Sequence, residues 1–325
     1  MTRKTEFCLR VFGTAALAAA MAVAVPAGVA HAAFESSPAG FGAGTTGGAG
    51  GETVTVTTAS AFTSAVADAV ARTVRVSGKI TLANKTLVKI GSNKTILGVG
   101  SGSGFTGGGL AVDKSSNVII RNLAISKAVG TDAIQIQRGA TRVWVDHNDL
   151  SSDLDHGKDY YDGLLDISHA ADGITVSWNK FHDHYKVSLV GHSDSNAAED
   201  TGKLHVTYSH NWFENVNSRL PSLRFGTGHA YDNYFHAVTD SAVHSRMNAQ
   251  FLAQNNVFES TKVCLETTGD SDVDGYLNES GNSFGGCTNE ITRTGSMTNA
   301  PYSFTLEPTS TVKATVTAGA GVGRI

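Results

Sequence analysis

Proline and cysteine are scarce in this sequence of 325 residues, which has five prolines, three cysteines and 36 glycines. Only 17% of the residues are charged. Few prolines together with abundant glycine favour a protein of strands and tight turns over a helical bundle, because glycine adopts the backbone conformations that tight corners need.

Long apolar runs are absent after residue 32, so we expect no later segment to cross a membrane. At the N-terminus, three basic residues precede an apolar stretch from 11 to 30, and Ala30-His31-Ala32 is a small-x-small cleavage motif. The pattern predicts a secretory signal peptide over residues 1–32 and a secreted, extracellular protein. A membrane anchor is the alternative, which Pro26 and the cleavage motif disfavour.

Positive charge is also limited. Residues 1–32 hold three basic residues and one acidic residue, which leaves 22 basic and 28 acidic residues in residues 33–325, a net charge of −6. Such a surface disfavours nucleic acid as a partner, and an acidic substrate would need a local basic cluster. We expect residues 33–325 to form a single domain, and nothing in them requires more than a monomer.

Two cysteines, Cys264 and Cys287, follow the predicted signal peptide. A pair of cysteines in an exported protein favours a disulfide, because export leads to an oxidising compartment. Two unpaired thiols are the alternative, and zinc would need more ligands than these two residues offer.

A repeated unit organises the middle of the chain: a β-branched strand, then Asn. Asn suits the turn after a strand because it tolerates the left-handed conformation, and stacked Asn side chains can bond from one repeat to the next. A period in the low twenties with short strands predicts an all-β solenoid, whose stacked coils bury a continuous core. A β-sandwich is the alternative, but its strands recur every 8–12 residues. The repeated Asn residues are spaced 26, 31, 32, 22 and 23 positions apart: Asn122, Asn148, Asn179, Asn211, Asn233 and Asn256.

Other segments surround this repeat. Thr53–Val56 is predicted as a strand and 59–72 as one short N-terminal helix, whereas 301–323 is predicted as an irregular C-terminal segment that covers or caps the solenoid. Two coils are longer than the shortest, by insertions at about 151–161 and 184–200. Insertions at one phase of a solenoid lie on one face, which is often the binding face.

Three acidic residues near these insertions, Asp132, Asp162 and Asp166, form the first candidate site. Asp162 and Asp166 are four apart, and residues an even number apart on a strand face the same side. Asp132 lies one coil earlier, so stacking can bring all three carboxylates together into the oxygen site that calcium prefers. Three solvated carboxylates on turns are the alternative.

A basic cluster, Lys186, Arg219 and Arg224, forms the second candidate site. Pro221 restricts the backbone between the two arginines. Arg binds carboxylates in a two-pronged manner and Lys adds a point charge, so the cluster indicates an anionic ligand. Ordinary salt bridges between coils are the alternative.

Histidines are the third set considered, with His182 and His184 on either side of Asp183. Alternate strand residues face together, which allows a zinc or copper site. We favour hydrogen-bonded structural roles, because several histidines flank the repeated strands.

Four ordered segments resemble motifs of the pectate lyases of the first polysaccharide lyase family, and the likeness extends from about residue 41 to 323. The Arg-x-Pro-x-x-Arg pattern is weak by itself, but four motifs in order on a matching repeat are specific. The segments are Val143–Asn148, Asp159–Ile167, His182–Lys186 and Asn217–Gly226.

This resemblance implies a right-handed parallel β-helix, calcium and cleavage of α-1,4-linked polygalacturonate in pectin. By position, Lys186 and Arg224 match contacts to substrate carboxylates, and Arg219 matches the proposed catalytic base. Arg normally stays protonated, so a water or hydroxide held by Arg219 is the alternative base. Position 162 is often Glu in relatives, and the shorter Asp affects calcium affinity. The positions that match the family's calcium ligands are Asp132, Asp162 and Asp166.

Three other functions are compatible with such a fold. A calcium-independent pectin lyase is disfavoured by the three aspartates, which that branch lacks. A polygalacturonase would need paired carboxylates around a water, and its motifs are missing. A non-catalytic polysaccharide-binding β-helix gives no reason for three cations beside a calcium site.

Overall fold

The computed structural model describes residues 1–2 and 36–325. The predicted signal peptide therefore lies almost wholly outside the described residues, and it stays a prediction. In the described part of the chain, no helix is long and apolar enough to cross a membrane.

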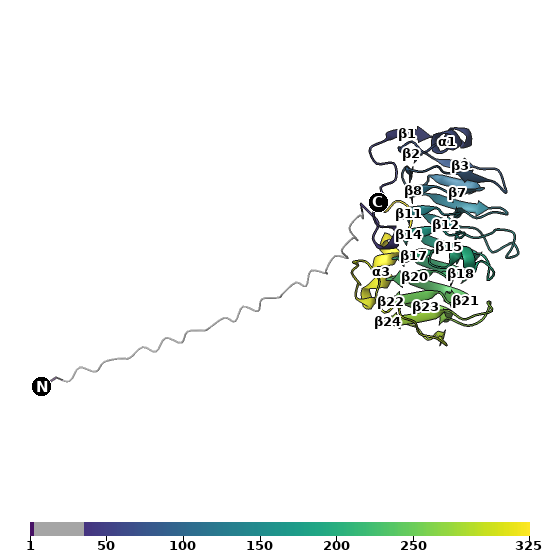
Figure 1. Cartoon of the computed structure of the whole chain (residues 1–325). Coiled ribbons are helices and arrows are strands. Elements are labelled where there is room, and N and C mark those ends of the chain that lie inside the picture. Colours follow the sequence, from purple (N-terminus) through teal and green to yellow (C-terminus); the bar gives the residue numbers. More distant parts are fainter. Residues whose placement is uncertain (3–35) are drawn as a thin grey trace. The chain divides into compact units, whose positions relative to one another are not determined.

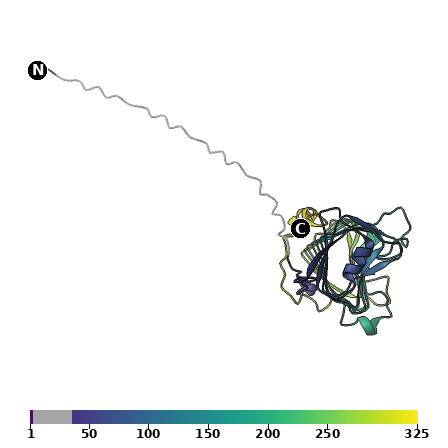
Figure 2. The ribbon, with the colours of Figure 1, turned by 90° about the horizontal axis from the view of Figure 1, so that it is seen from above.

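Residues 36–325 form a right-handed parallel β-helix, as predicted, whose coils stack along one axis (Figure 1). The strands of successive coils superimpose when viewed along this axis (Figure 2). In this part of the chain, ten strands make the first sheet: β1 (Glu52–Val56), β2 (Arg72–Val76), β5 (Lys94–Gly98), β8 (Ser116–Arg121), β11 (Thr141–Asp146), β14 (Asp172–Ser177), β17 (His205–Ser209), β20 (Thr227–Tyr231), β22 (Gln250–Gln254) and β24 (Tyr276–Ser280).

Two further rows of parallel strands complete each coil, and they join at the long strand β21 (Tyr234–Arg246). One row is β3 (Lys79–Thr81), β6 (Gly104–Gly107), β9 (Ala124–Ala128), β12 (Asp149–Ser151), β15 (Lys180–Lys186) and β18 (Trp212–Ser218), which pairs with the first half of β21. The other row is β4 (Leu87–Lys89), β7 (Gly109–Asp113), β10 (Ile134–Gln137), β13 (Leu165–Ile167), β16 (Leu189–Val190) and β19 (Ser222–Arg224), which pairs with its second half. Strand β23 (Val257–Glu266) follows β21, and β25 (Thr288–Glu290) follows β23.

The interior is a stack of apolar side chains, one level per coil. Phe181, Phe213, Phe235 and Phe258 occupy equivalent register positions, and their ring centroids lie 5.0, 4.7 and 4.6 Å apart. These spacings equal the separation of hydrogen-bonded strands, so the backbone ladder itself sets the ring stacking. All four rings are fully buried, and each stabilises the fold by about 1.5–3 kcal/mol.

Five of the six repeated asparagines, from Asn148 to Asn256, form the predicted ladder. Asn122 is one position out of register, because Leu123 faces Asn148, and its amide donates to the Gly98 oxygen instead. Asn148 Nδ2 donates to Asn179 Oδ1 at 2.9 Å, and the same bond recurs from each coil to the next as far as Asn282, one coil beyond the predicted end. The left-handed conformation lies on Asn122 itself, but in later coils on the residue before each Asn, such as Trp178 before Asn179. The prediction that Asn takes this conformation is therefore wrong for most coils.

One helix covers one end of the solenoid, and a second helix and a short 3-10 helix lie against its outside (Figure 1). Helix α1 (Ala59–Val66) buries Phe62 and Val66 over the first coils and ends six residues before the predicted boundary. The C-terminal segment, predicted as irregular, contains helix α3 (Thr309–Gly319), whose Val312 and Val316 pack with Tyr234 and Val257. A short 3-10 helix, η1 (Gly40–Gly42), lies against β14 and β17. The disulfide Cys264–Cys287 is present, with a Cα–Cα distance of 5.8 Å.

Candidate active site

Two long loops border the row of strands β10, β13, β16 and β19. The first, residues 152–164, leads from β12 into β13, and the second, residues 191–204, leads from β16 to β17 and holds helix α2 (Ala197–Asp200). The prediction that both insertions have one phase is therefore wrong, because they lie at opposite ends of parallel strands. Residues 184–186, assigned to the second insertion, belong to strand β15. The two loops therefore flank opposite ends of these strands.

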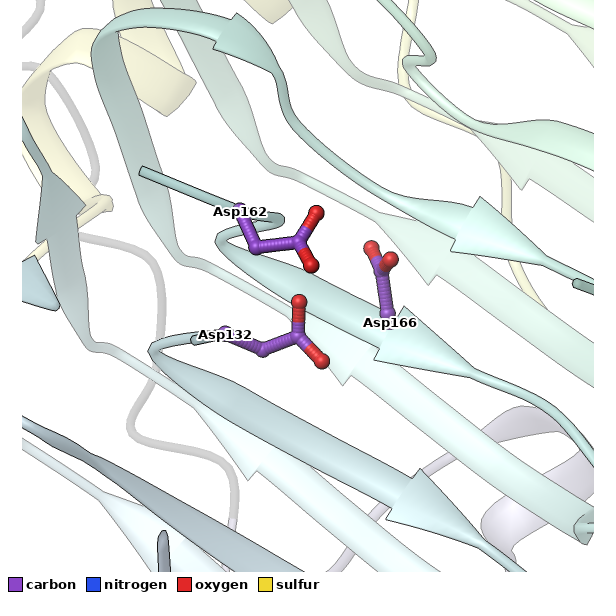
Figure 3. A group of neighbouring side chains, drawn as sticks. All are labelled: Asp132, Asp162 and Asp166. Carbon is purple, nitrogen blue, oxygen red and sulfur yellow. The ribbon is translucent and has the colours of Figure 1, made fainter. Parts of the chain in front are cut away.

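The three predicted acidic residues meet at this face. One oxygen from each of Asp132, Asp162 and Asp166 lies within 4.8 Å of the others, and the carboxylates point toward one another (Figure 3). Asp166 is on β13, but Asp162 is on the turn before it, so the expectation that they share a strand is wrong. The backbone N–H of Gly163 donates to Asp132 at 2.9 Å, and that of Leu189 donates to Asp166 at 2.9 Å.

The electrostatics of this cluster favour a bound cation. Burial, with the nearby charge of Asp162, raises the pKa of Asp132 to about 6. Burial and the charge of Asp132 raise the pKa of Asp166 well above its ordinary value. Three adjacent carboxylates resist ionising together unless a cation compensates them. Their hard oxygen donors are the ligands that calcium prefers, so the residues fit a calcium ion.

His184 holds the turn that carries Asp162. Its Nε2 is 2.6 Å from the backbone oxygen of Asp162, and its Nδ1 is 2.6 Å from Oγ of Ser152. Burial lowers the pKa of His184 to about 4, so the ring is neutral near neutral pH. This is the hydrogen-bonded structural role that the sequence favoured for the histidines.

Lys186 links the acidic cluster to the basic one. At the end of β15, its Nζ lies 2.9 Å from Oδ1 of Asp159 and 3.3 Å from Oδ1 of Asp162. The ammonium therefore stands beside the candidate metal position and faces the cleft.

Arg219 lies on the turn between β18 and β19, with a left-handed φ of 65°. A non-glycine residue persists in this region only when its surroundings hold it. The backbone N–H of Ser188 donates to the Arg219 oxygen at 2.8 Å, and the N–H of Leu220 donates to the Ala242 oxygen at 2.9 Å. These bonds to the coils on either side fix the backbone at Arg219.

Arg224, the last residue of β19, is held by the second loop. Its Nη1 donates to the Gly191 backbone oxygen at 2.8 Å, and its Nε donates to Asp194. Burial opposes ionisation of Asp194, but hydrogen bonds from Arg224 and Ser271 outweigh it and lower the pKa of that carboxyl.

All three predicted cations line one cleft of about 380 Å³. Sequence reasoning missed Lys158, His244 and Arg246, which also line it. A signal existed for Arg246: it follows Arg224 by 22 positions, the same spacing as the shortest coil, and the two pair in register. Burial and the charge of Arg224 lower the pKa of Arg246 to about 10.

Fold and site together define a parallel β-helix protein with an acidic cluster and a cationic cleft on one exposed face. The family model described as pectate lyase matches residues 12–325. The chain therefore belongs to the pectate lyase family, a family of lyases.

Individual relatives agree with this assignment. The chain is 50% identical over 285 residues to pectate lyase B of Colletotrichum gloeosporioides, covering 87% of this chain and 84% of the relative. It is 42% identical over 334 residues to the pectate trisaccharide-lyase of Bacillus licheniformis, covering 98% and 96%. A pectate lyase of a Bacillus species, solved in complex with trigalacturonate, superimposes with a TM-score of 0.81 and 32% identity, covering 88% of this chain and 99% of that one.

Proposed function

We propose that this protein cleaves α-1,4-linked polygalacturonate by calcium-assisted β-elimination and releases oligogalacturonates with 4,5-unsaturated ends. The observation that carries the proposal is the acidic cluster of Asp132, Asp162 and Asp166 beside a cleft lined by Lys186, Arg219 and Arg224. The similarity to a structure that holds trigalacturonate supports the choice of substrate.

The side chains of the cleft suit the anionic substrate. Lys186 and Arg224 donate hydrogen bonds to galacturonate carboxylates and withdraw charge from the adjacent C5. Calcium held by the three aspartates supplies further positive charge next to the substrate carboxylate. Withdrawal of charge makes the C5 proton more acidic.

Arg219 is the proposed base. After it has lost a proton to alkaline solution, its neutral guanidine accepts the C5 proton. The electrons of the C–H bond form the C4=C5 double bond, the C4–O bond breaks, and the leaving oxygen takes a proton from solvent. Because a guanidinium group rarely loses its proton, the second route uses a hydroxide held by Arg219 as the base that removes the C5 proton. Either route requires Arg219 at the reacting carbon and favours alkaline solution.

We also propose that the protein is secreted as a monomer after removal of residues 1–32. The disulfide Cys264–Cys287 supports export, because such bonds persist in oxidising surroundings. Mass spectrometry of the protein recovered from the culture medium tests this, with a mature chain starting at Ala33 as the expected result.

The test of activity is the growth of ultraviolet absorbance on polygalacturonate at alkaline pH, with calcium and then with a chelator. Growth that the chelator abolishes is the expected result. Chelator-resistant growth on methylated pectin alone would instead indicate a pectin lyase. No growth on either substrate would indicate a binding protein.

A further inference from the structure

Lys158 lines the cleft from the first long loop, residues 152–164, and has no part in the proposed chemistry. The residue is exposed, so its ammonium group can be reached by a ligand in the cleft. In the part of the chain that the structure describes, this ammonium group makes no hydrogen bond and no ion pair.

The other cationic side chains of the cleft have fixed partners, with one exception. Lys186 is paired with two aspartates at 2.9 and 3.3 Å, Arg224 with one aspartate, and Arg246 with the hydroxyl groups of two serines at 2.7 and 3.2 Å. Arg219 is the exception, and the proposed function assigns it to the C5 proton. Lys158 is therefore a cation of the cleft that neither a protein partner among the described residues nor the proposed reaction accounts for.

The loop that carries Lys158 is fixed at its base. Tyr161, near the end of the loop, donates from its hydroxyl group to Oδ2 of Asp153, near the start, at 2.8 Å. The backbone N–H of Gly130, on the previous coil, donates to the Tyr160 oxygen at 3.0 Å. A ligand that binds Lys158 has to order its side chain but not the base of the loop, which limits the entropic cost of binding.

The cations of the cleft lie at opposite ends of the strands beneath them. Lys186 and Arg219 precede β16 and β19, and the loop of Lys158 precedes β13. Arg224 and Arg246 are the last residues of β19 and β21. A polyuronate carries one carboxylate on each sugar unit, so three cations at one end exceed the need of a single unit. The proposed function uses Lys186 for the carboxylate of the reacting unit and Arg219 for its proton, which leaves Lys158 for another unit.

We propose that Lys158 is a substrate-binding residue, whose ammonium group binds the carboxylate of a galacturonate unit neighbouring the one at Arg219. The inference rests on the proposed function for the identity of the sugar. It makes the site selective, because a methyl ester on that neighbouring unit cannot form the ion pair. Cleavage of pectin therefore depends on esterification of a neighbour as well as of the reacting unit.

Lys158→Met tests the contact, because it keeps the length of the side chain and removes its charge. On polygalacturonate we expect KM to rise about 3- to 10-fold with kcat nearly unchanged, as for one exposed, hydrogen-bonded ion pair. On partly methyl-esterified polygalacturonate the rise should be smaller, because many units there lack the carboxylate. Equal rises on the two substrates would assign Lys158 a structural role and overturn the inference.

Lys203→Met is the matched control. Lys203 is exposed on the second long loop, its ammonium group has no partner among the described residues, and it does not line the cleft. The change removes the same charge, so it measures general attraction of the polyanion, and we expect KM to stay within about twofold because salt screens distant charges. Lys158→Arg keeps the charge and should retain most of the affinity. The same rise of KM for Lys203→Met and Lys158→Met would reduce the effect to net charge and contradict the proposal.

Binding separates this inference from the proposed function. In an Arg219→Lys background with calcium, calorimetry should show hexagalacturonate binding about 3- to 10-fold more weakly to the Lys158→Met variant. If the unmodified protein forms no unsaturated product, the proposed function fails, and this affinity still decides the role of Lys158. Equal affinity with an unchanged KM would overturn the inference.

Discussion

Asp194 accepts a hydrogen bond from Nε of Arg224 and, through its other oxygen, one from the backbone N–H of Asp272 at 3.0 Å. One carboxylate thus joins the loop after β16, a side chain of the cleft and a loop 78 positions further along the chain. Arg224 is oriented by contacts from a different coil, so its position depends on Asp194 and Asp272, which do not line the cleft.

Replacing Asp194 by Asn tests this dependence. We expect kcat/KM on polygalacturonate to fall about tenfold, because loss of a charge-assisted hydrogen bond costs about 1.5–3 kcal/mol and part of it is recovered by the amide. The effect should appear mainly in KM. Glu259→Gln, which breaks an exposed ion pair with Lys313, is the control and should leave kinetics unchanged. Unchanged kinetics for Asp194→Asn would show that Arg224 does not need this anchor.

Arg219→Lys separates binding from chemistry. Lys keeps the positive charge but not the guanidinium geometry, so we expect kcat to fall about 10²- to 10⁴-fold with little change in KM. Steady-state ultraviolet assays at saturating calcium measure both values. Arg138→Lys, an exposed change at a residue paired with Asp113, is the control. A variant with nearly full turnover would remove Arg219 from the role of base.

Calcium should stabilise the protein through the acidic cluster. A ligand that binds only the folded state at about 100 times its Kd adds about 2.7 kcal/mol, so the Tm should rise on adding calcium and fall back with a chelator. Asp166→Asn should abolish this rise, because it removes a ligand and a charge. Asp113→Asn, which lies outside the cluster, should retain it. A calcium response that persists in Asp166→Asn would place the ion elsewhere.

Asp232 gives a pH dependence unrelated to the site. Burial raises the pKa of Asp232 to about 7, above its unfolded value near 4, so the folded state binds the extra proton. Below about pH 4 the free energy of unfolding does not change with pH on account of this group. As the pH rises from about 4 toward 7 the free energy of unfolding decreases, because the carboxyl ionises readily when unfolded but only at a cost when buried.

Asp232→Asn removes that ionisation. We expect a higher Tm than the unmodified protein at pH 8 and little difference at pH 4, since each unit of pKa is about 1.4 kcal/mol. Asp155→Asn, at an exposed position, should change neither value. Equal Tm values for Asp232→Asn and the unmodified protein at pH 8 would show that the buried charge is compensated.

Because each asparagine of the ladder bonds to its neighbours on both sides, replacing a single one should lower the free energy of unfolding strongly. Asn211→Ala removes bonds to Asn179, Asn233 and the Val176 oxygen, and each buried group left unpaired costs about 1–3 kcal/mol. We expect a loss of several kcal/mol in urea unfolding. Asn282→Ala, at the partly exposed end of the ladder, should cost less. Equal losses at the two positions would argue against a cooperative ladder.

Much of the fold could be predicted because it is periodic. Each coil repeats the same local pattern, so the recurrence of Asn148, Asn179 and Asn211 carries information about stacking without any knowledge of distant contacts. The same periodicity placed the aspartates and the cations on neighbouring coils. Helix α3 lacked such a signal, because its short apolar stripe of Val312 and Val316 has meaning only against the outer surface that it covers.

The sequence by itself therefore determined the solenoid, the candidate disulfide and the types of residue at the site. Only the tertiary structure decided that Lys158 of the first loop and Arg246 line the same cleft, and that Asp194 anchors Arg224. The physical reason is that stacking is set by short-range periodicity. The position of a side chain in the cleft is set by contacts between loops of variable length, which no period describes.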